Sequence, residues 1–358
     1  MITLQDILAA AAGALNGISQ SVMAMSFGFA MIPSALAYLV GIIGCLAFNS
    51  TVPISFQADT MVMAGTIGRN RKERLSMVCI AGLIMTAIGA FGLLDNIIDF
   101  AGERVTTAMM AGVCIIMAKV SFDMVKADKK IGPISMALGI LVYMFTKSLV
   151  YTCVISVIGS TIADRIINKN KEKQDMISQV NDKIKYERPI FNFNVLRGVL
   201  SLICITIGGN IAFTKISCAI SGVAGNSDHV SIYSGLADAV SSIFGGSPIS
   251  IVLAPTAAAP NPKWSAIILM AIMAICLGTG LVSKVAKYIP SCSVSGTLFV
   301  IAIIMSLPSN LQNAFTGATP GEALAGSVAM IVTTLTDPFF GMVAGILVNL
   351  VVVHLGLA

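Results

Sequence analysis

Two short proline-containing breaks interrupt a very apolar chain, and each carries hydroxyl groups that could orient a solute. The first is Thr51-Val52-Pro53-Ile54-Ser55, and the second, in the other half of the chain, is Gly246-Ser247-Pro248-Ile249-Ser250. A helix break inside a bilayer frees backbone N–H and C=O groups that are costly unless protein or a cavity satisfies them. One such break per half is typical of the substrate site of an inverted-repeat transporter. The alternative is two ordinary loops that share a tripeptide by chance.

Polar side chains at the breaks, and at mid-span in two other segments, are the candidates for binding a solute. Half-helix N-termini offer free N–H groups and a positive dipole end, and hydroxyls and amides supply the other contacts. A hydroxyl can instead bond back to its own helix, whereas an amide in lipid needs a neighbour or a ligand. The candidate substrate-binding residues are Gln20, Ser55, Gln57, Thr206, Asn210, Gly246, Ser247 and Ser250, with Asn16 as a further mid-span amide.

Ionisable residues inside the apolar segments are few, and such residues are functional candidates by default. Asp59 follows the first break and Asp238 lies within an apolar span, so both are candidates for coupling to H+ or Na+. Asp238 is close to Ser234 in sequence and could instead cap or pair locally. Asp337 lies near a span junction, and Lys119 lies near a span end, where its amine can reach the interface.

The composition indicates an integral membrane protein. Hydrophobic residues make up 56% of the 358 residues and charged residues only 11%, against roughly 25% charged residues in a soluble domain. Apolar stretches long enough to span recur along the whole chain and leave no room for a separate soluble domain. The net charge of +5 sits in short loops, so nucleic acid is not an expected partner.

Other chemistries find little support in the sequence. The eight cysteines are scattered without a CxxC or Cys/His pair, so no disulfide framework, metal site or cofactor is indicated. There is no HExxH, GxSxG or Walker A motif, and we expect no enzyme. A channel would need a ring of like groups or a repeated filter, which a single pair of breaks does not supply.

The apolar pattern predicts an all-α polytopic protein with about fourteen transmembrane spans. The polar stretch 168–189 is interpreted as a solvated linker loop between a first repeat, 1–167, and a second, 190–358. The spans fall near 7–30, 32–48, 50–67, 74–95, 104–122, 132–146 and 148–167, then 194–214, 229–244, 246–259, 263–286, 292–307, 320–336 and 338–357. The breaks lie in the third span of each half, and an odd number of spans per half implies inverted repeats.

Charge placement predicts the orientation. Loops after odd-numbered spans hold seventeen Lys or Arg residues, and loops after even-numbered spans hold four. The positive-inside rule then places the odd loops in the cytoplasm and both termini outside. This inference depends on the span count, because one miscounted span before residue 69 would reverse it.

A further pattern lies in the second half, where Leu236-Ala237-Asp238-Ala239 is followed by Gly245-Gly246-Ser247 and by Ser250. With the weaker Ala111-Gly112 and Thr336-Asp337, this resembles the nucleobase–cation symporter family of xanthine, uracil and purine permeases, and most closely its guanine/hypoxanthine branch. The likeness covers most of the chain in layout but only about fifteen residues in motif.

The resemblance implies a uracil-permease-like fold of two inverted seven-span repeats. Spans one to four and eight to eleven would form a core domain, and spans five to seven and twelve to fourteen a gate domain. Short strands in the broken spans three and ten would face each other at the site.

Three departures from the family pattern matter. Family members carry a Glu in span ten that holds the base, but here 251–255 reads Ile-Val-Leu-Ala-Pro. Span eight usually carries an acid, whereas 202–210 has none. Family members also place both termini in the cytoplasm, against the charge count. The first two departures put purine transport and proton coupling at those positions in doubt.

The sequence therefore predicts a secondary active transporter for a small polar solute, with a purine or other nucleobase as the first hypothesis. Alternating access would carry the solute, with H+ or Na+ as candidate coupling ions and a homodimer as a candidate assembly. The alternatives are an anion transporter on the same fold, like the sulfate permeases, and a non-transporting relic of the scaffold. Missing acids and two opposed helix N-termini would suit an anion. The expected location is the lipid bilayer of a prokaryotic cytoplasmic (inner) membrane.

Overall fold

The computed structural model of the chain describes residues 2–167, 183–286 and 288–354 and is mostly helical. The first half contains α1 (Leu4–Ser26), α2 (Met31–Ala47), β1 (Ile54–Phe56), α3 (Ala58–Ile67), α4 (Arg71–Ala90), α5 (Leu94–Ala101), α6 (Glu103–Ala127), α7 (Ile131–Thr146) and α8 (Leu149–Ile167). The second half begins with α9 (Phe193–Ser221), α10 (Ser227–Ile243), β2 (Ile249–Ile251), the 3-10 helix η1 (Pro255–Ala258), α11 (Pro262–Gly278) and α12 (Leu281–Ala286). It ends with η2 (Ser291–Val294), α13 (Ser295–Phe299), the π-helix η3 (Val300–Ser306), α14 (Leu307–Phe315), α15 (Pro320–Leu335) and α16 (Pro338–His354).

Side-chain caps fix where many of the helices begin. The Thr3 hydroxyl accepts from the Asp6 N–H while the Asp6 carboxylate accepts from the Thr3 N–H, which closes a capping box at α1. Thr319 and Glu322 do the same at α15. Asparagines before α4, α9 and α10 accept from first-turn N–H groups in the same way. Because such caps satisfy N–H groups that have no partner within the helix, they set the element boundaries locally.

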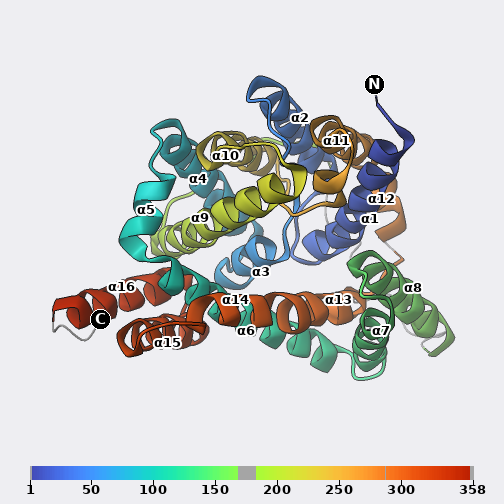
Figure 1. Ribbon diagram of the computed structural model, residues 1–358. Coiled ribbons are helices and arrows are strands. Elements are labelled where there is room, and N and C mark those ends of the chain that lie inside the picture. The colour runs from blue at the N-terminus through green and yellow to red at the C-terminus, as the bar shows by residue number, and fades with distance from the viewer. Residues whose placement is uncertain (1, 168–182, 287, 355–358) are drawn as a thin grey trace.

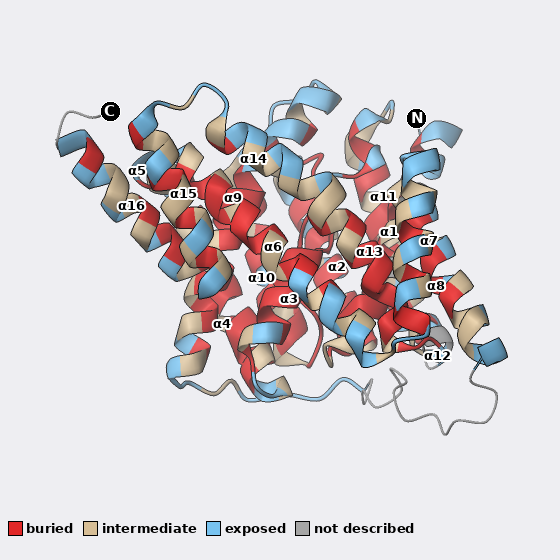
Figure 2. Cartoon of the chain, turned by 90° about the horizontal axis from the view of Figure 1, so that it is seen from below, coloured by how far each residue is buried: buried red, intermediate tan, exposed pale blue. Residues whose placement is uncertain are grey.

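The helices form two layers (Figure 1). We call α1–α4 together with α9–α11 the core layer, and α6–α8 together with α13–α16 the gate layer. The short helices α5 and α12, which the sequence did not predict, lie on the connections between the layers. Buried residues follow the middle of the molecule and exposed residues gather toward the helix ends (Figure 2). Whether the layers move as two domains is a prediction that the fold alone does not test.

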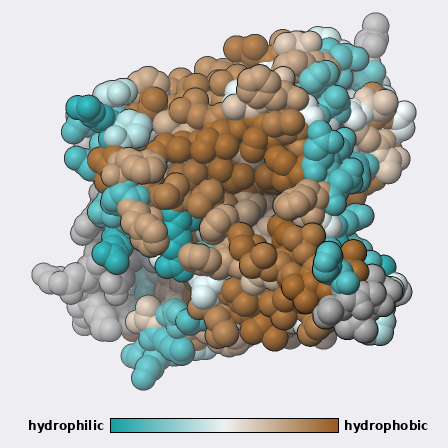
Figure 3. All heavy atoms as spheres, turned by 90° about the vertical axis from the view of Figure 1, so that its left-hand side faces the viewer, coloured by the Kyte–Doolittle hydropathy of each residue, from teal (hydrophilic) through white to brown (hydrophobic). Residues whose placement is uncertain are grey.

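Five stretches are long and apolar enough to cross a membrane, namely α1, α4, α6, α9 and the segment Ser291–Phe315. Five shorter helices, α2, α7, α11, α15 and α16, are also apolar. Figure 3 shows a broad hydrophobic band on one face of the molecule, bordered on both sides by hydrophilic residues. The polytopic helical architecture is therefore as expected, while the count of fourteen spans and the inverted repeat remain predictions.

The second broken segment differs from an ordinary span. The sequence placed span ten at 246–259, but this stretch contains the strand β2 and the four-residue η1 and no α-helix. Pro255, Pro260 and Pro262 account for this, because proline lacks the N–H that a helix interior needs. The first segment does continue into a helix, α3, after its strand.

The charge argument depends on how many spans precede residue 69, and that number stays a prediction. Three elements, α1, α2 and β1–α3, precede Gly68. The start of α1 and the end of α16 lie along the same edge of the molecule (Figure 2). The opposite edge carries the Arg-rich start of α4 and the described part of the polar stretch between α8 and α9.

We predict that this Arg/Lys-rich edge faces the cytoplasm. A cysteine at the exposed Lys185 should then be shielded from an impermeant thiol reagent in intact cells, while a cysteine at the exposed Val223, on the opposite edge, should be labelled. Labelling is measured above that of the unchanged chain, whose own eight cysteines are at least partly buried. Ready labelling at 185 with protection at 223 would reverse the orientation.

Candidate functional site

The two breaks meet as an antiparallel pair of strands at the centre of the protein. β1 and β2 pair with Ile54 opposite Ile251, Ser55 opposite Ser250 and Phe56 opposite Ile249. Each strand begins one residue after its proline, where the chain cannot continue as a helix. The strands predicted in the two broken segments are therefore present. Since Ser55 and Ser250 are directly opposed, their side chains project from the same face of the pair.

Buried side chains brace both strands. The Tyr233 hydroxyl donates to the Val52 carbonyl at 2.6 Å, just before β1. One Asp238 carboxylate oxygen accepts from the Ile249 N–H at 2.7 Å, at the start of β2. These contacts satisfy backbone groups that water would otherwise have to reach, so α10 holds the two breaks in place. Asp238 is thus a local partner of the strand in this structure.

The N-terminus of α3 lies directly after β1 and carries its own carboxylate. Asp59 is buried, and its two oxygens accept from the Thr60 N–H at 2.7 Å and from the Gln57 Nε2 at 3.2 Å. No Lys, Arg or His of the described part of the chain forms an ion pair with Asp59. A buried carboxylate is therefore held near the middle of the protein by hydrogen bonds alone.

Helix α1 contributes an amide to the same region. A Cβ added at Gly17 would lie 2.8 Å from the Ser55 Oγ, so α1 approaches β1 closely at this glycine. Gln20 is one helical turn further along and is 7% exposed. Its Nε2 donates to the Asn16 Oδ1 at 3.3 Å, while its Oε1 has no partner among the described residues. A buried amide oxygen without a partner is a ready acceptor for a solute or a water molecule.

Helix α9 carries two of the predicted substrate-binding residues, Thr206 and Asn210, and their contacts differ. Thr206 is buried beside Gly209, and a Cβ at Gly209 would lie 3.4 Å from the Gln57 Nε2. This part of α9 therefore faces the start of α3. Asn210 instead donates to the Ser231 hydroxyl at 2.7 Å, which ties α9 to α10.

Gly246 and Ser247 make contacts with the protein itself. A Cβ at Gly246 would lie 2.8 Å from the Ser34 backbone nitrogen, so this glycine packs against the start of α2. The Ser247 N–H donates to the Ser34 Oγ at 2.8 Å, and its carbonyl accepts from the Ser241 hydroxyl. These two residues hold the entry to β2, whereas Ser55 and Ser250 lie within the strands and Gln57 directly follows β1.

The structure adds residues that the sequence did not single out. The Tyr38 hydroxyl lies 3.1 Å from the Ser55 Oγ. In the gate layer, the Asn310 amide donates to the Cys114 sulfur at 3.7 Å. Asn310 follows the π-helix η3, an irregularity that is frequent at functional sites. The stretch 306–313 around it reads Ser-Leu-Pro-Ser-Asn-Leu-Gln-Asn, so no local signal in the sequence singles out Asn310.

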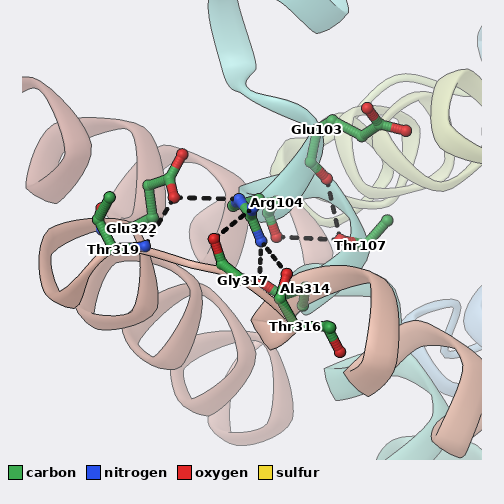
Figure 4. A network of polar contacts seen from close by, with 8 residues as sticks. All are labelled: Glu103, Arg104, Thr107, Ala314, Thr316, Gly317, Thr319 and Glu322. Carbon is green, nitrogen blue, oxygen red and sulfur yellow. Dashed lines mark hydrogen bonds and ion pairs between the residues drawn. The ribbon is translucent and has the colours of Figure 1, made fainter. Parts of the chain in front are cut away.

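Two cavities in the described residues lie away from the strands. One of about 270 Å³ is lined by Phe48, Ser50 and His229, and another of about 620 Å³ lies beside Arg104 and Glu322. Figure 4 shows the Arg104 guanidinium directed at Glu322, at 3.1 Å, and at the carbonyls of Thr316 and Gly317, each at 3.0 Å. Its donors are therefore occupied within the gate layer and are not free for an anion.

No metal centre is formed by the side chains that the structure describes, since no group of three or more His, Cys, Asp or Glu residues lies together there.

Comparison with known proteins relates the fold to anion transporters. No protein-family model matches the chain, and no curated protein does. The transmembrane domain of the cyanobacterial bicarbonate transporter BicA matches with a TM-score of 0.67 and 14% identity, over 96% of this chain and 97% of that one. SLC26A9 matches with a TM-score of 0.73 and 12% identity, over 99% of this chain and 65% of its own length. The murine anion transporter Slc26a9 in the inward-facing state gives 0.70 and 13%, over 99% and 68%.

These matches show the fold, and they correct the resemblance to the nucleobase–cation symporters. That assignment was wrong, because the structural neighbours are a bicarbonate transporter and solute carrier 26 proteins, one of them described as an anion transporter. The physical reason lies in the motif residues. Asp238 binds the backbone of β2, and Gly246 and Ser247 pack against α2. These three motif residues therefore contact the protein itself.

We predict that Asp238→Asn is tolerated and that Asp238→Leu is not. The asparagine oxygen can still accept from the Ile249 N–H, whereas leucine leaves that buried donor unpaired at a cost of about 1–3 kcal/mol. The measurement is thermal unfolding of the purified protein in detergent, with anion uptake by reconstituted protein as a second readout. Loss of gradient-driven uptake in a stable Asp238→Asn protein would assign Asp238 a coupling role instead.

Proposed function

We propose that this protein is a secondary transporter of a small anion, moved by alternating access of the core layer against the gate layer. The observation that carries the proposal is the central strand pair. In it Ser55 lies opposite Ser250, and the N-terminus of α3 follows β1 in the chain. Hydroxyls and the positive end of a helix would together orient an anion. Further support is the fold, which is shared with a bicarbonate transporter and with an anion transporter.

The carboxylate of Asp59 at the same site argues against an anion that binds without a cation. Asp59 lies in the first turn of α3 and already takes the Thr60 N–H. Two negative unit charges about 5 Å apart repel by about 3 kcal/mol at an effective dielectric constant of about 20. This is comparable with what a helix N-terminus and two hydroxyls supply. We therefore propose that Asp59 binds H+ or Na+ when the anion binds, which makes the transport coupled.

The function is tested by uptake into proteoliposomes. We expect the protein to accumulate labelled bicarbonate or sulfate, with uracil as a comparison solute that is not taken up. Ser55→Leu and Ser250→Leu should each lose at least about 1–3 kcal/mol of anion binding, because leucine removes a hydroxyl and fills the space around it. Ser327→Leu, on α15, is the matched control, since its hydroxyl bonds only to its own helix. Uptake that is unchanged in both strand variants would contradict the proposed site.

Coupling is tested at Asp59. Asp59→Asn keeps the shape and the acceptor for the Thr60 N–H but removes the charge. We expect accumulation of the anion against a gradient to fail, while exchange of labelled for unlabelled anion survives. Uptake is compared with and without an imposed H+ or Na+ gradient. If the asparagine variant still accumulates the anion in response to the gradient, Asp59 is a structural cap only.

A further inference from the structure

Arg197 and Asp337 join the core layer to the gate layer through one polar contact. Arg197 is the fifth residue of α9, near its N-terminus, and Asp337 lies between α15 and α16. We propose that this ion pair is a latch. It holds the core layer and the gate layer in one relative position, and it must break in each transport cycle. The proposal rests on the alternating-access function given above, and it concerns the movement of the layers rather than the solute.

The contact is specific to the geometry of arginine. The Arg197 Nε donates to the Asp337 Oδ2, and the Nη2 donates to the Thr336 carbonyl at 3.1 Å. The guanidinium also lies 5.9 Å from the centre of the Phe340 ring. A planar fork thus engages the end of α15, the junction and the start of α16 together. Such a contact forms only when α9 and the α15–α16 junction are aligned along their length. A shift of α9 past the junction would therefore break all three interactions.

The burial of Asp337 makes it costly in free energy to break the ion pair. Its side chain is 0% exposed, while that of Arg197 is 34% exposed. If Arg197 moves away, a carboxylate remains buried without a counter-ion, which is the costly case for a buried ion pair. The open state of the latch therefore needs another partner for Asp337 or access of water to it.

Other ion pairs do not bridge the layers. Of the four ion pairs found among the described residues, Arg104–Glu322 lies within the gate layer and Lys126–Asp123 lies within α6. Arg71–Glu187 joins α4 to the segment before α9. α9 also approaches the gate layer closely at Gly208. A Cβ added at this glycine would lie only 3.1 Å from the Thr106 methyl group. Among the ion pairs of the described residues, Arg197–Asp337 is therefore the one that links the two layers.

Asp337→Asn separates the latch from the structural role of this residue. The other Asp337 oxygen accepts from the Phe340 N–H at 3.1 Å and so caps α16. Asparagine is an equally good helix cap, so the substitution keeps the cap and removes the charge. Arg197→Gln removes the partner charge from the other side. Glu322→Gln is the matched control, because it breaks an ion pair of similar kind inside the gate layer (Figure 4).

The test is the distance between two spin labels, measured by pulsed electron spin resonance on the full chain in lipid nanodiscs without added anion. The labels are introduced as non-natural amino acids at Lys72 on α4 and at Lys129 between α6 and α7, both of which are exposed. We expect one dominant distance in the unchanged protein and in Glu322→Gln. Asp337→Asn and Arg197→Gln should each increase the population of a second distance about tenfold or more, the usual size of coupling between linked contacts.

Two results would overturn the latch. One is an unchanged distance distribution in both Asp337→Asn and Arg197→Gln. The other is a shift in Glu322→Gln as large as theirs, because the effect would then be a general loosening. Since no solute is present, a shift in the latch variants of a protein that moves no anion would uphold the latch and reject the proposed function.

Discussion

Backbone hydrogen bonding between the two broken segments is the constraint on which this protein depends. Inside a bilayer an extended strand has no water to satisfy its N–H and C=O groups, so a single break would be unstable. Here β1 and β2 satisfy each other, with Ser55 opposite Ser250. Tyr233 and Asp238 bind backbone groups at the start of the two strands. The polar pair at the centre, the bracing by α10 and the start of α3 all follow from that one requirement.

The strand pair also explains how a site arises between otherwise apolar helices. It places the N-terminus of α3 at the centre of the protein, and it brings Gln57 and Asp59 there as part of the chain. Gly17 lets α1 approach closely enough for Gln20 to lie nearby. The second half does not repeat this arrangement, because three prolines reduce the segment after β2 to η1. The site is consequently asymmetric, with the helix α3 after β1 and only the short η1 after β2.

Sequence reasoning identified the breaks and their serines, because proline and serine in an apolar run are local signals, whereas the strands were expected only from the family resemblance. It could not find Tyr38, Tyr233 or Asn310, whose roles depend on which distant segments they meet. It assigned the wrong family, because it relied on a short motif around Asp238, Gly246 and Ser247, whose contacts in the structure are with the protein itself. It also noted Asp337 only as a charge near a junction, since nothing in the sequence pairs it with Arg197.

The central claim is that a small anion binds at the β1–β2 pair. Its most direct test is the midpoint of thermal unfolding of the purified protein, titrated with bicarbonate and with sulfate at constant ionic strength. A ligand that binds only the folded protein stabilises it by about 2.7 kcal/mol at 100 times its Kd. The account predicts a saturable rise in the midpoint for at least one of these anions, and loss of that rise in Ser250→Leu. An equal rise in the unchanged protein and in Ser250→Leu, or none with either anion, would contradict it.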